Sequence, residues 1–165
     1  PIGARDKAIL ELLYSSGLRV SEVCTIQIYD VDDEYVKVFG KGQKERLVPL
    51  GQCALAAIDH YLLYYRSQYD SEKEKALFVT KKGRPLDRIS IWRMIKSHAK
   101  KAGITKSISP HTLRHSFATH LLDNGAELRV IQEMLGHANI NSTERYTHVS
   151  RAHIQKAFTA FHPRS

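Results

Sequence analysis

Apolar residues recur at helical spacing in the first part of the chain and define two helices with a break between them. The apolar set within residues 8–13 is followed by the stop signal Ser16-Gly17, so an amphipathic helix should end there. A short second helix should follow, with Ser21 as its cap and Arg19 in the junction. The same spacing returns over residues 54–65 and predicts a further helix.

Alternation of apolar and polar residues predicts a β-hairpin between these helices. Residues 35–39 alternate and are rich in β-branched and aromatic types, residues 40–45 form a turn, and residues 46–50 return. Lys41 lies at the tip of this hairpin. Residues 77–80 predict one more short strand.

The second half of the chain is predicted to be helical almost throughout. Helices are expected over residues 91–102, 111–122 and 128–135, with a short terminal helix over residues 154–161. Ser109-Pro110 offers an N-cap and a proline at the first position of the helix over residues 111–122. Gly136 ends the helix over residues 128–135. The predicted fold class is therefore mainly α with a small antiparallel β-sheet, that is, α+β.

The large aromatic residues and the cysteines receive a structural interpretation. Phe78, Trp92 and Phe117 each fall on an apolar stripe, so we expect core packing in preference to stacking against bases. Cys24 and Cys53 show no C-x-x-C spacing, which predicts reduced structural thiols without a disulfide framework or a cysteine zinc site.

Composition points to one basic domain with a polyanionic partner. The 165 residues carry a net charge of +8, which favours nucleic acid first and an anionic membrane second. No stretch approaches the roughly 20 apolar residues of a membrane span, so a soluble cytoplasmic protein is expected. Because the chain begins with Pro1 and enters a helical pattern at once, we expect a fragment of a longer protein.

Three segments concentrate side chains suited to phosphate. They are residues 16–22, residues 110–115, and residues 135–137 followed by Arg145-Tyr146. His111 and Arg114 lie three apart on one helix and therefore share nearly the same face. Any one arginine alone is more simply explained as a solvated surface charge.

Histidines at helical spacing raise the alternative of a metal site. His111 and His115 are four apart, but no glutamate lies between them and no third ligand has a recognisable spacing. We therefore expect no bound metal, and interpret His115 and His120 as packing or supporting residues.

Taken in order, one set of residues resembles the active site of the tyrosine recombinases, especially the bacterial Xer type. The set comprises Arg19, Lys41, His111, Arg114, His137 and Tyr146. The resemblance extends from the Gly17-Leu18-Arg19-Val20-Ser21-Glu22 box to the terminal His162-Pro163-Arg164. It implies that residues 1–165 form a single catalytic domain, without the N-terminal core-binding domain that closes around DNA, and that this fragment binds DNA weakly.

The resemblance implies a role for each residue around one DNA phosphate. Arg19 and Arg114 would grip its non-bridging oxygens, a task that suits guanidinium forks. His111 and His137 would hydrogen-bond to the same phosphate, and His111 would also help to move the tyrosine proton. Tyr146 would be the nucleophile and form a 3′-phosphotyrosyl link. A phenol with a pKa of about 10 needs a base or a strongly cationic site to attack at neutral pH.

The leaving group and the supporting acid follow from the same resemblance. Lys41 would protonate the departing 5′-oxygen, and Lys44 is the competing candidate in the same turn. Strand transfer to a second duplex conserves bond energy, so neither ATP nor a metal cofactor is implied. Glu22 matches a buried acid that orients Arg19, or is an ordinary surface ion pair with it.

Partners are also implied only by the resemblance. They are a double-stranded DNA recombination site, a homo- or hetero-tetramer with a related recombinase, and a DNA translocase of the FtsK type acting at the nucleoid. Dimer resolution of chromosomes or plasmids is the favoured role over element mobility. Residues 149–165 match a helix that docks into a neighbouring protomer, although their apolar stripe could equally fold back on its own core.

Two other functions compete with this interpretation. Residues 111–123 and 127–135 resemble a helix-turn-helix, which suits a non-enzymatic DNA-binding protein. A type IB topoisomerase would share the chemistry without choosing a site. For the enzyme, we expect Arg114→Ala to abolish cleavage while leaving the fold intact.

Overall fold

The computed structural model of the chain describes residues 2–69, 74–136 and 148–165, and the side chains of the same residues except 148–151. The helices are α1 Ile2–Ser15, α2 Val20–Thr25, α3 Gln52–Tyr64, α4 Arg88–Lys101, α5 Pro110–Asp123, α6 Leu128–Leu135 and α7 His148–Phe161. Strands β1 Tyr35–Phe39 and β2 Glu45–Pro49 pair in an antiparallel sheet, and short 3-10 turns cover Ile28–Asp30, Lys41–Gln43 and Arg66–Tyr69. The predicted α+β class is confirmed.

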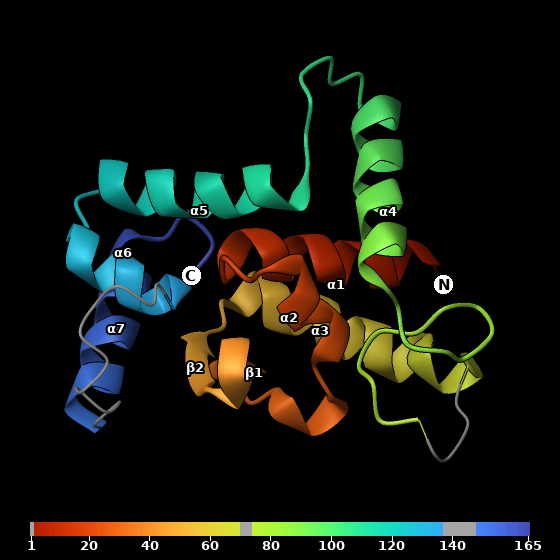
Figure 1. Cartoon of the computed structure of the whole chain (residues 1–165), viewed down its shortest axis with the longest axis horizontal. Helices are drawn as coiled ribbons and strands as arrows, with labels where there is room; N and C mark the ends of the chain where they lie inside the picture. The colour runs from red at the N-terminus through yellow and green to blue at the C-terminus, as the bar shows by residue number, and fades with distance from the viewer. Residues whose placement is uncertain (1, 70–73, 137–147) are drawn as a thin grey trace.

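Helix α1 is the central element of the molecule. It packs between α3 on one side and α5 on the other, as Figure 1 shows. Its apolar face, with Ala8, Ile9, Leu12 and Leu13, is completely buried, which explains why the helical pattern in this segment was so regular. Helix α4 leaves the body at a steep angle to α1 (Figure 1).

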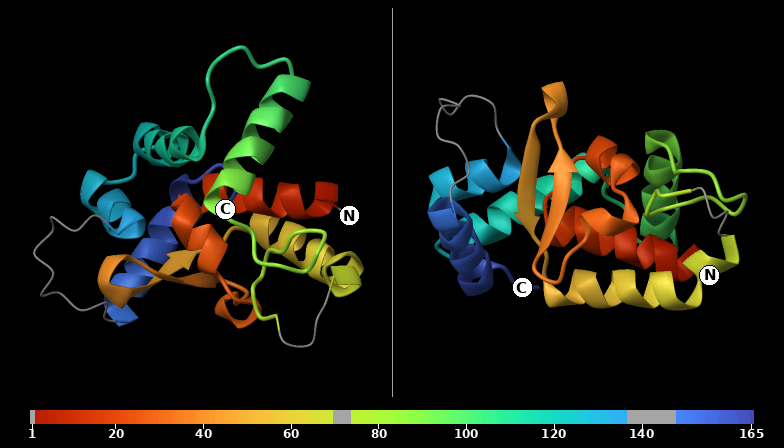
Figure 2. Two further views of the ribbon diagram at one scale, coloured as in Figure 1. Left: turned by 45° about the vertical axis from the view of Figure 1, so that its right-hand side comes forward. Right: turned by 90° about the horizontal axis from the view of Figure 1, so that it is seen from below.

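The hairpin projects from the helical body. Figure 2 shows β1 and β2 as a twisted ribbon whose turn reaches beyond the neighbouring helices. The strands pair from Tyr35 opposite Pro49 to Phe39 opposite Glu45, one residue earlier on the second strand than the sequence predicted. The alternating side chains Val36, Val38 and Val48 are buried, so this face of the ribbon joins the core.

Buried apolar residues form two clusters. The larger is built from α1, α2, the hairpin, α3, the 77–86 segment and α4. The smaller joins α5, α6 and α7, and Phe117, Met134, Ile154 and Phe158 are almost fully buried in it. The terminal helix therefore folds back on the chain's own core in this structure.

Three predictions about local structure were wrong. Residues 77–80 do not form a strand paired in the sheet, because Val79 bridges only Pro85 while Ala76 bridges Gln27. Arg19, not Ser21, occupies the N-cap position of α2. Trp92 is 48% exposed, since α4 buries Ile91 and Ile95 and turns the indole away from the core. Phe78 and Phe117 are buried as expected.

Among the described residues, none of the helices combines the length and the apolar character that a membrane span requires.

Candidate active site

One groove gathers residues from three distant parts of the chain. It lies where the first turns of α2, α4 and α5 meet. It is lined by Leu18, Arg19, Val20, Ser21, Arg88, Ile89, Trp92, Ser109, Pro110, His111 and Arg114. Three of the six predicted catalytic residues, Arg19, His111 and Arg114, thus face the same space.

Arg19 is held at the mouth of this groove by the turn between α1 and α2. Gly17 makes the turn with a left-handed φ of 61°, and a Cβ there would lie 2.4 Å from Cδ1 of Phe117. The backbone N–H of Arg19 donates to Glu22 Oε2 at 2.8 Å, and its Nη1 donates to Oε1 at 3.3 Å. With 42% of its side chain exposed, Arg19 keeps free donors for a ligand.

Arg114 sits deeper, on the buried face of α5. Its Nη1 donates to the Gly17 carbonyl oxygen and its Nη2 to that of Leu135, each at 2.7 Å. Burial, together with the nearby charges of Arg19 and Arg46, lowers the pKa of Arg114 to about 10, so the group still remains cationic at neutral pH. Arg19 and Arg114 are therefore close enough for their charges to interact.

The position of Arg114 corrects one sequence-based expectation. We expected Arg114→Ala to leave the fold intact, but Arg114 is only 8% exposed and its guanidinium bridges the carbonyls of Gly17 and Leu135. Removing it would leave both carbonyls without their donors and a cavity behind. Loss of activity in that variant would therefore mix local chemistry with damage to the fold.

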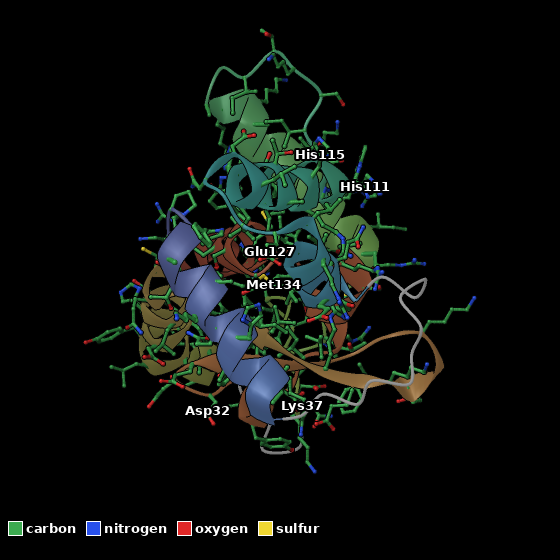
Figure 3. The ribbon with its side chains drawn as sticks, turned by 90° about the vertical axis from the view of Figure 1, so that its left-hand side faces the viewer. Asp32, Lys37, His111, His115, Glu127 and Met134 are labelled. Carbon is green, nitrogen blue, oxygen red and sulfur yellow. The ribbon has the colours of Figure 1, made fainter. Side chains whose placement is uncertain are left out.

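His111 is presented by the start of α5. Ser109 caps this helix by accepting from the Thr112 N–H at 3.3 Å, and Pro110 occupies the first helical position, as predicted. His111 is exposed at the groove, and Figure 3 shows it on the same helix as His115. An imidazole there can donate a hydrogen bond to an anion bound between Arg19 and Arg114.

Glu22 is buried, which decides between its two interpretations. It is only 2% exposed and forms a bidentate ion pair with Arg46, in which Nη1 contacts Oε1 and Nη2 donates to Oε2 at 3.1 Å. Burial alone would raise the pKa of Glu22, but the hydrogen bonds and charge of Arg46, helped by Arg19, hold it below its ordinary value.

Arg46 is the residue that the sequence analysis missed. It lies on β2 directly opposite Val38, and both side chains are buried. Strand alternation offered a signal, because Arg46 and Val48 are two apart and must share a face. A charged residue on the buried face of a strand implies a buried partner of opposite charge.

The remaining predicted residues lie away from the groove or outside the described part of the chain. Lys41 and Lys44 are both exposed in the hairpin turn, so their positions do not separate the two candidates for the acid. His137 and Tyr146 lie outside the described residues.

His115 and His120, interpreted as packing or supporting residues, both lie near hydroxyl groups. His120 Nδ1 lies 2.6 Å from the Tyr14 hydroxyl, and the exposed His115 lies 3.5 Å from the Thr119 hydroxyl. Within residues 2–69, 74–136 and 148–165, no group of three or more His, Cys, Asp or Glu side chains could hold a metal ion.

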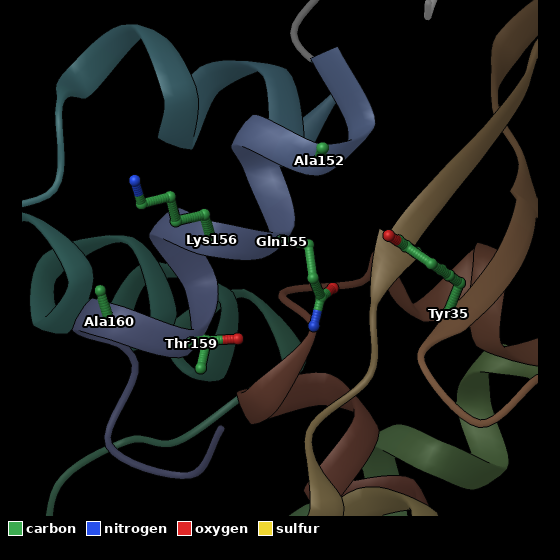
Figure 4. A pocket seen from close by; sticks show the side chains of 6 residues that line it. All are labelled: Tyr35, Ala152, Gln155, Lys156, Thr159 and Ala160. Atoms are coloured by element: carbon green, nitrogen blue, oxygen red, sulfur yellow. The ribbon is translucent and has the colours of Figure 1, made fainter. Parts of the chain in front are cut away.

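A second hollow lies between α7 and the hairpin. Figure 4 shows Gln155 and Thr159 of α7 on one side and Tyr35 of β1 on the other. Ala152, Lys156 and Ala160 complete its lining. It contains none of the predicted catalytic residues.

The groove is suited to an oxyanion. Three guanidinium groups, those of Arg19, Arg88 and Arg114, and the imidazole of His111 line it. Glu22 turns both carboxylate oxygens toward Arg19 and Arg46. Preorganised cationic donors of this kind stabilise negative charge that develops on a phosphate during its displacement.

Comparison with known proteins identifies the family of the chain. Residues 1–153 match the sequence model of the phage integrase family. The chain belongs to this family. Within the phage integrase family, it is 53% identical to tyrosine recombinase XerD of Staphylococcus saprophyticus, over 99% of this chain and 56% of that protein. It is 49% identical to tyrosine recombinase XerD of Staphylococcus aureus over the same shares.

Solved structures show the same fold. The XerA recombinase superposes with a TM-score of 0.77 and 39% identity, over 98% of this chain and 60% of that one. The XerH site-specific recombinase, solved with its difH substrate in a pre-cleavage complex, gives 0.72 and 26%, over 96% of this chain and 43% of that one. The chain thus spans 56% of the XerD relatives, 60% of the XerA chain and 43% of the XerH chain.

Proposed function

We propose that this chain is the catalytic part of a site-specific DNA recombinase of the Xer type. The observation that carries the proposal is the convergence of Arg19 and Arg114, from opposite halves of the sequence, on one groove that also contains His111. Two guanidinium groups and an imidazole form the anion-binding half of a phosphodiester cleavage site. Membership of the phage integrase family and 53% identity to a tyrosine recombinase XerD support this assignment.

In the proposed reaction, Tyr146 attacks a DNA phosphate held by Arg19, Arg114, His111 and His137. The phenol oxygen forms a 3′-phosphotyrosyl bond as its proton passes to His111. The bond to the 5′-oxygen breaks as Lys41, or Lys44 in its place, donates a proton to that oxygen. Attack by the 5′-hydroxyl of a second duplex reverses these steps and releases the tyrosine. No ATP, metal or other cofactor enters this scheme.

The proposed partner is a double-stranded DNA recombination site. The XerH neighbour was solved with difH, its substrate, both before and after cleavage. By analogy, the whole protein would assemble on DNA as a tetramer with itself or a related recombinase, in the cytoplasm at the nucleoid. Control by a DNA translocase of the FtsK type, and a role in resolving chromosome or plasmid dimers, complete the proposal.

A covalent trapping experiment tests the proposal. The full chain is incubated with a pool of duplexes of randomised sequence, each nicked beside the position of cleavage so that the leaving fragment is lost. A tyrosine recombinase becomes covalently attached to selected DNA, and sequencing that DNA gives the site. Tyr146→Phe should trap nothing.

The same experiment separates the two alternatives. A helix-turn-helix protein would bind DNA without any attachment that survives denaturation. A type IB topoisomerase would trap DNA without selecting a sequence and would relax a supercoiled plasmid that lacks the selected site. Similarity to Xer recombinases over nearly the whole chain favours neither of them.

A further inference from the structure

Arg46 is a buried arginine whose three guanidinium nitrogens all contact other protein groups. Both terminal nitrogens contact the Glu22 carboxylate, and Nε lies 3.4 Å from the Met134 carbonyl oxygen. It does not line the groove that Arg19 and Arg114 face. Its guanidinium is therefore committed to other protein groups and is not presented to a ligand.

Through Glu22, Arg46 is linked to Arg19. Oε1 of Glu22 contacts Nη1 of both arginines, and Oε2 accepts from the Arg19 backbone and from Arg46 Nη2. One carboxylate thus fixes both the main chain and the side chain of Arg19, while Arg46 fixes the carboxylate. Without Arg46, Glu22 would be a buried anion with only a half-exposed partner.

Through Met134, Arg46 is linked to the end of α6. The last carbonyls of a helix have no partner within it, and here Arg46 and Arg114 approach two consecutive ones, Met134 and Leu135. The helix then ends at Gly136, whose φ is 67°, and a Cβ at that glycine would lie 3.0 Å from Arg46 Cδ. In the sequence, the next residue is His137.

We infer that Arg46 is a positioning residue that holds the phosphate-binding half of the site in register. On one side it fixes Arg19 through Glu22, and on the other it fixes the helix end from which the chain proceeds to His137. It acts through these groups and does not touch the DNA. This inference rests on the proposed function, because the reaction is what the positioning serves.

The first test replaces the guanidinium group of Arg46 by an ammonium group, which keeps the positive charge. Arg46→Lys can still neutralise Glu22 but cannot hold both carboxylate oxygens and the Met134 carbonyl at once. On the nicked duplex selected by trapping, the single-turnover cleavage rate at saturating DNA should fall about 100-fold, as for a misplacement of roughly 1 Å. The DNA dissociation constant should change less than about threefold, since the loss is in the transition state.

A second variant separates positioning from stability. Glu22→Gln combined with Arg46→Met removes both buried charges, so no unpaired ion remains and the thermal midpoint should stay near that of the wild type. Cleavage should remain as slow as in Arg46→Lys, because Arg19 has lost its ionic partner. Recovery of wild-type cleavage in this double variant would show that Arg46 is merely structural and would overturn the inference.

The matched control lies on the same hairpin. Lys37 also pairs with a carboxylate, Asp30, at 3.7 Å, but Figure 3 shows it far from His111. Lys37→Met should therefore cleave at the wild-type rate. Wild-type cleavage by a folded Arg46→Lys protein would count against the inference.

A readout that needs no cleavage keeps this inference separate from the proposed function. The Nε–H signal of Arg19 in a ¹⁵N spectrum should be sharp in the wild type and broadened in Arg46→Lys, while Lys37→Met leaves it unchanged. If the wild type formed no covalent complex with DNA, the proposed function would fail. An unchanged Arg19 signal in Arg46→Lys would contradict the positioning role alone.

Discussion

Buried charged side chains near the groove are matched by opposite charges or by carbonyl oxygens. Glu22 faces Arg46, and the buried Arg114 bridges two main-chain carbonyls. Asp6 of α1 contacts Arg5 at 2.7 Å and His98 of α4 at 2.9 Å. Each pairing fixes an element that borders the groove, so individual charged residues act as much through geometry as through charge.

His162 is a buried titratable residue that the proposed chemistry does not use. Its ring stacks on Phe158 with centroids 5.0 Å apart and lies 5.4 Å from the rings of Tyr14 and Phe117. Its Nδ1 accepts from the Arg164 backbone N–H, while Nε2 has no hydrogen-bond partner among the described residues. Burial, with smaller effects from His120 and Arg164, lowers the pKa of His162 to about 4.

This depressed pKa predicts a pH-dependent loss of stability. Between pH 6.5 and about 4 the unfolded chain binds a proton at His162 that the folded chain does not, so acidification favours unfolding. The free energy of unfolding from urea titrations should fall across this window by up to about 3 kcal/mol. His162→Phe keeps an aromatic ring but cannot titrate, so its stability should change less over the same range. Parallel pH profiles for both proteins would contradict the assignment.

At the scale of elements, local signals were the most reliable part of the sequence. Ser109-Pro110 and Gly136 marked the start of α5 and the end of α6, because capping and left-handed geometry depend on a few neighbouring residues. One local signal failed, because Arg19 and not Ser21 is the N-cap of α2. The other failures depended on distant partners. Residues 77–80 find only isolated bridges, Trp92 is exposed because the direction of α4 is set by tertiary packing, and the pairing of Arg46 with Glu22 spans separate elements.

The candidate site, too, could be predicted from the sequence only in part. Identities such as Arg19, His111 and Arg114 were accessible through resemblance to a family, since order and spacing are properties of the sequence. Their convergence on one groove was a hypothesis until the fold was known. The positions of His137 and Tyr146, outside the described residues, stay predictions.

The packing of α7 allows a test of whether the terminal helix folds on its own chain. Phe158 is 1% exposed in the cluster formed with α5 and α6, whereas Thr159 next to it is exposed. Phe158→Ala should therefore lower the free energy of unfolding by about 3–5 kcal/mol, and Thr159→Ala by less than about 0.5 kcal/mol. Unfolding curves measured at several protein concentrations should coincide. A loss that grows on dilution would instead mean that the helix docks into a second copy.

At the scale of the whole molecule, the net charge of +8 can strengthen DNA binding only through cations that lie on the DNA-binding surface. The groove combines Arg19, Arg88 and Arg114 with the exposed apolar side chains of Ile89 and Trp92. A cation on the DNA-binding face should contribute to the release of counterions from the phosphate backbone, and a cation elsewhere should not.

Arg88 and Lys37 provide that comparison. Arg88 begins α4 at the groove, while Lys37 lies on β1 away from it. The slope of log K against log salt concentration, measured by fluorescence anisotropy with a labelled duplex, should become shallower by about 1 in Arg88→Gln. Lys37→Gln removes the same formal charge and should leave the slope unchanged. Equal effects of the two substitutions would mean that net charge alone attracts DNA, and that the groove is not the surface to which it binds.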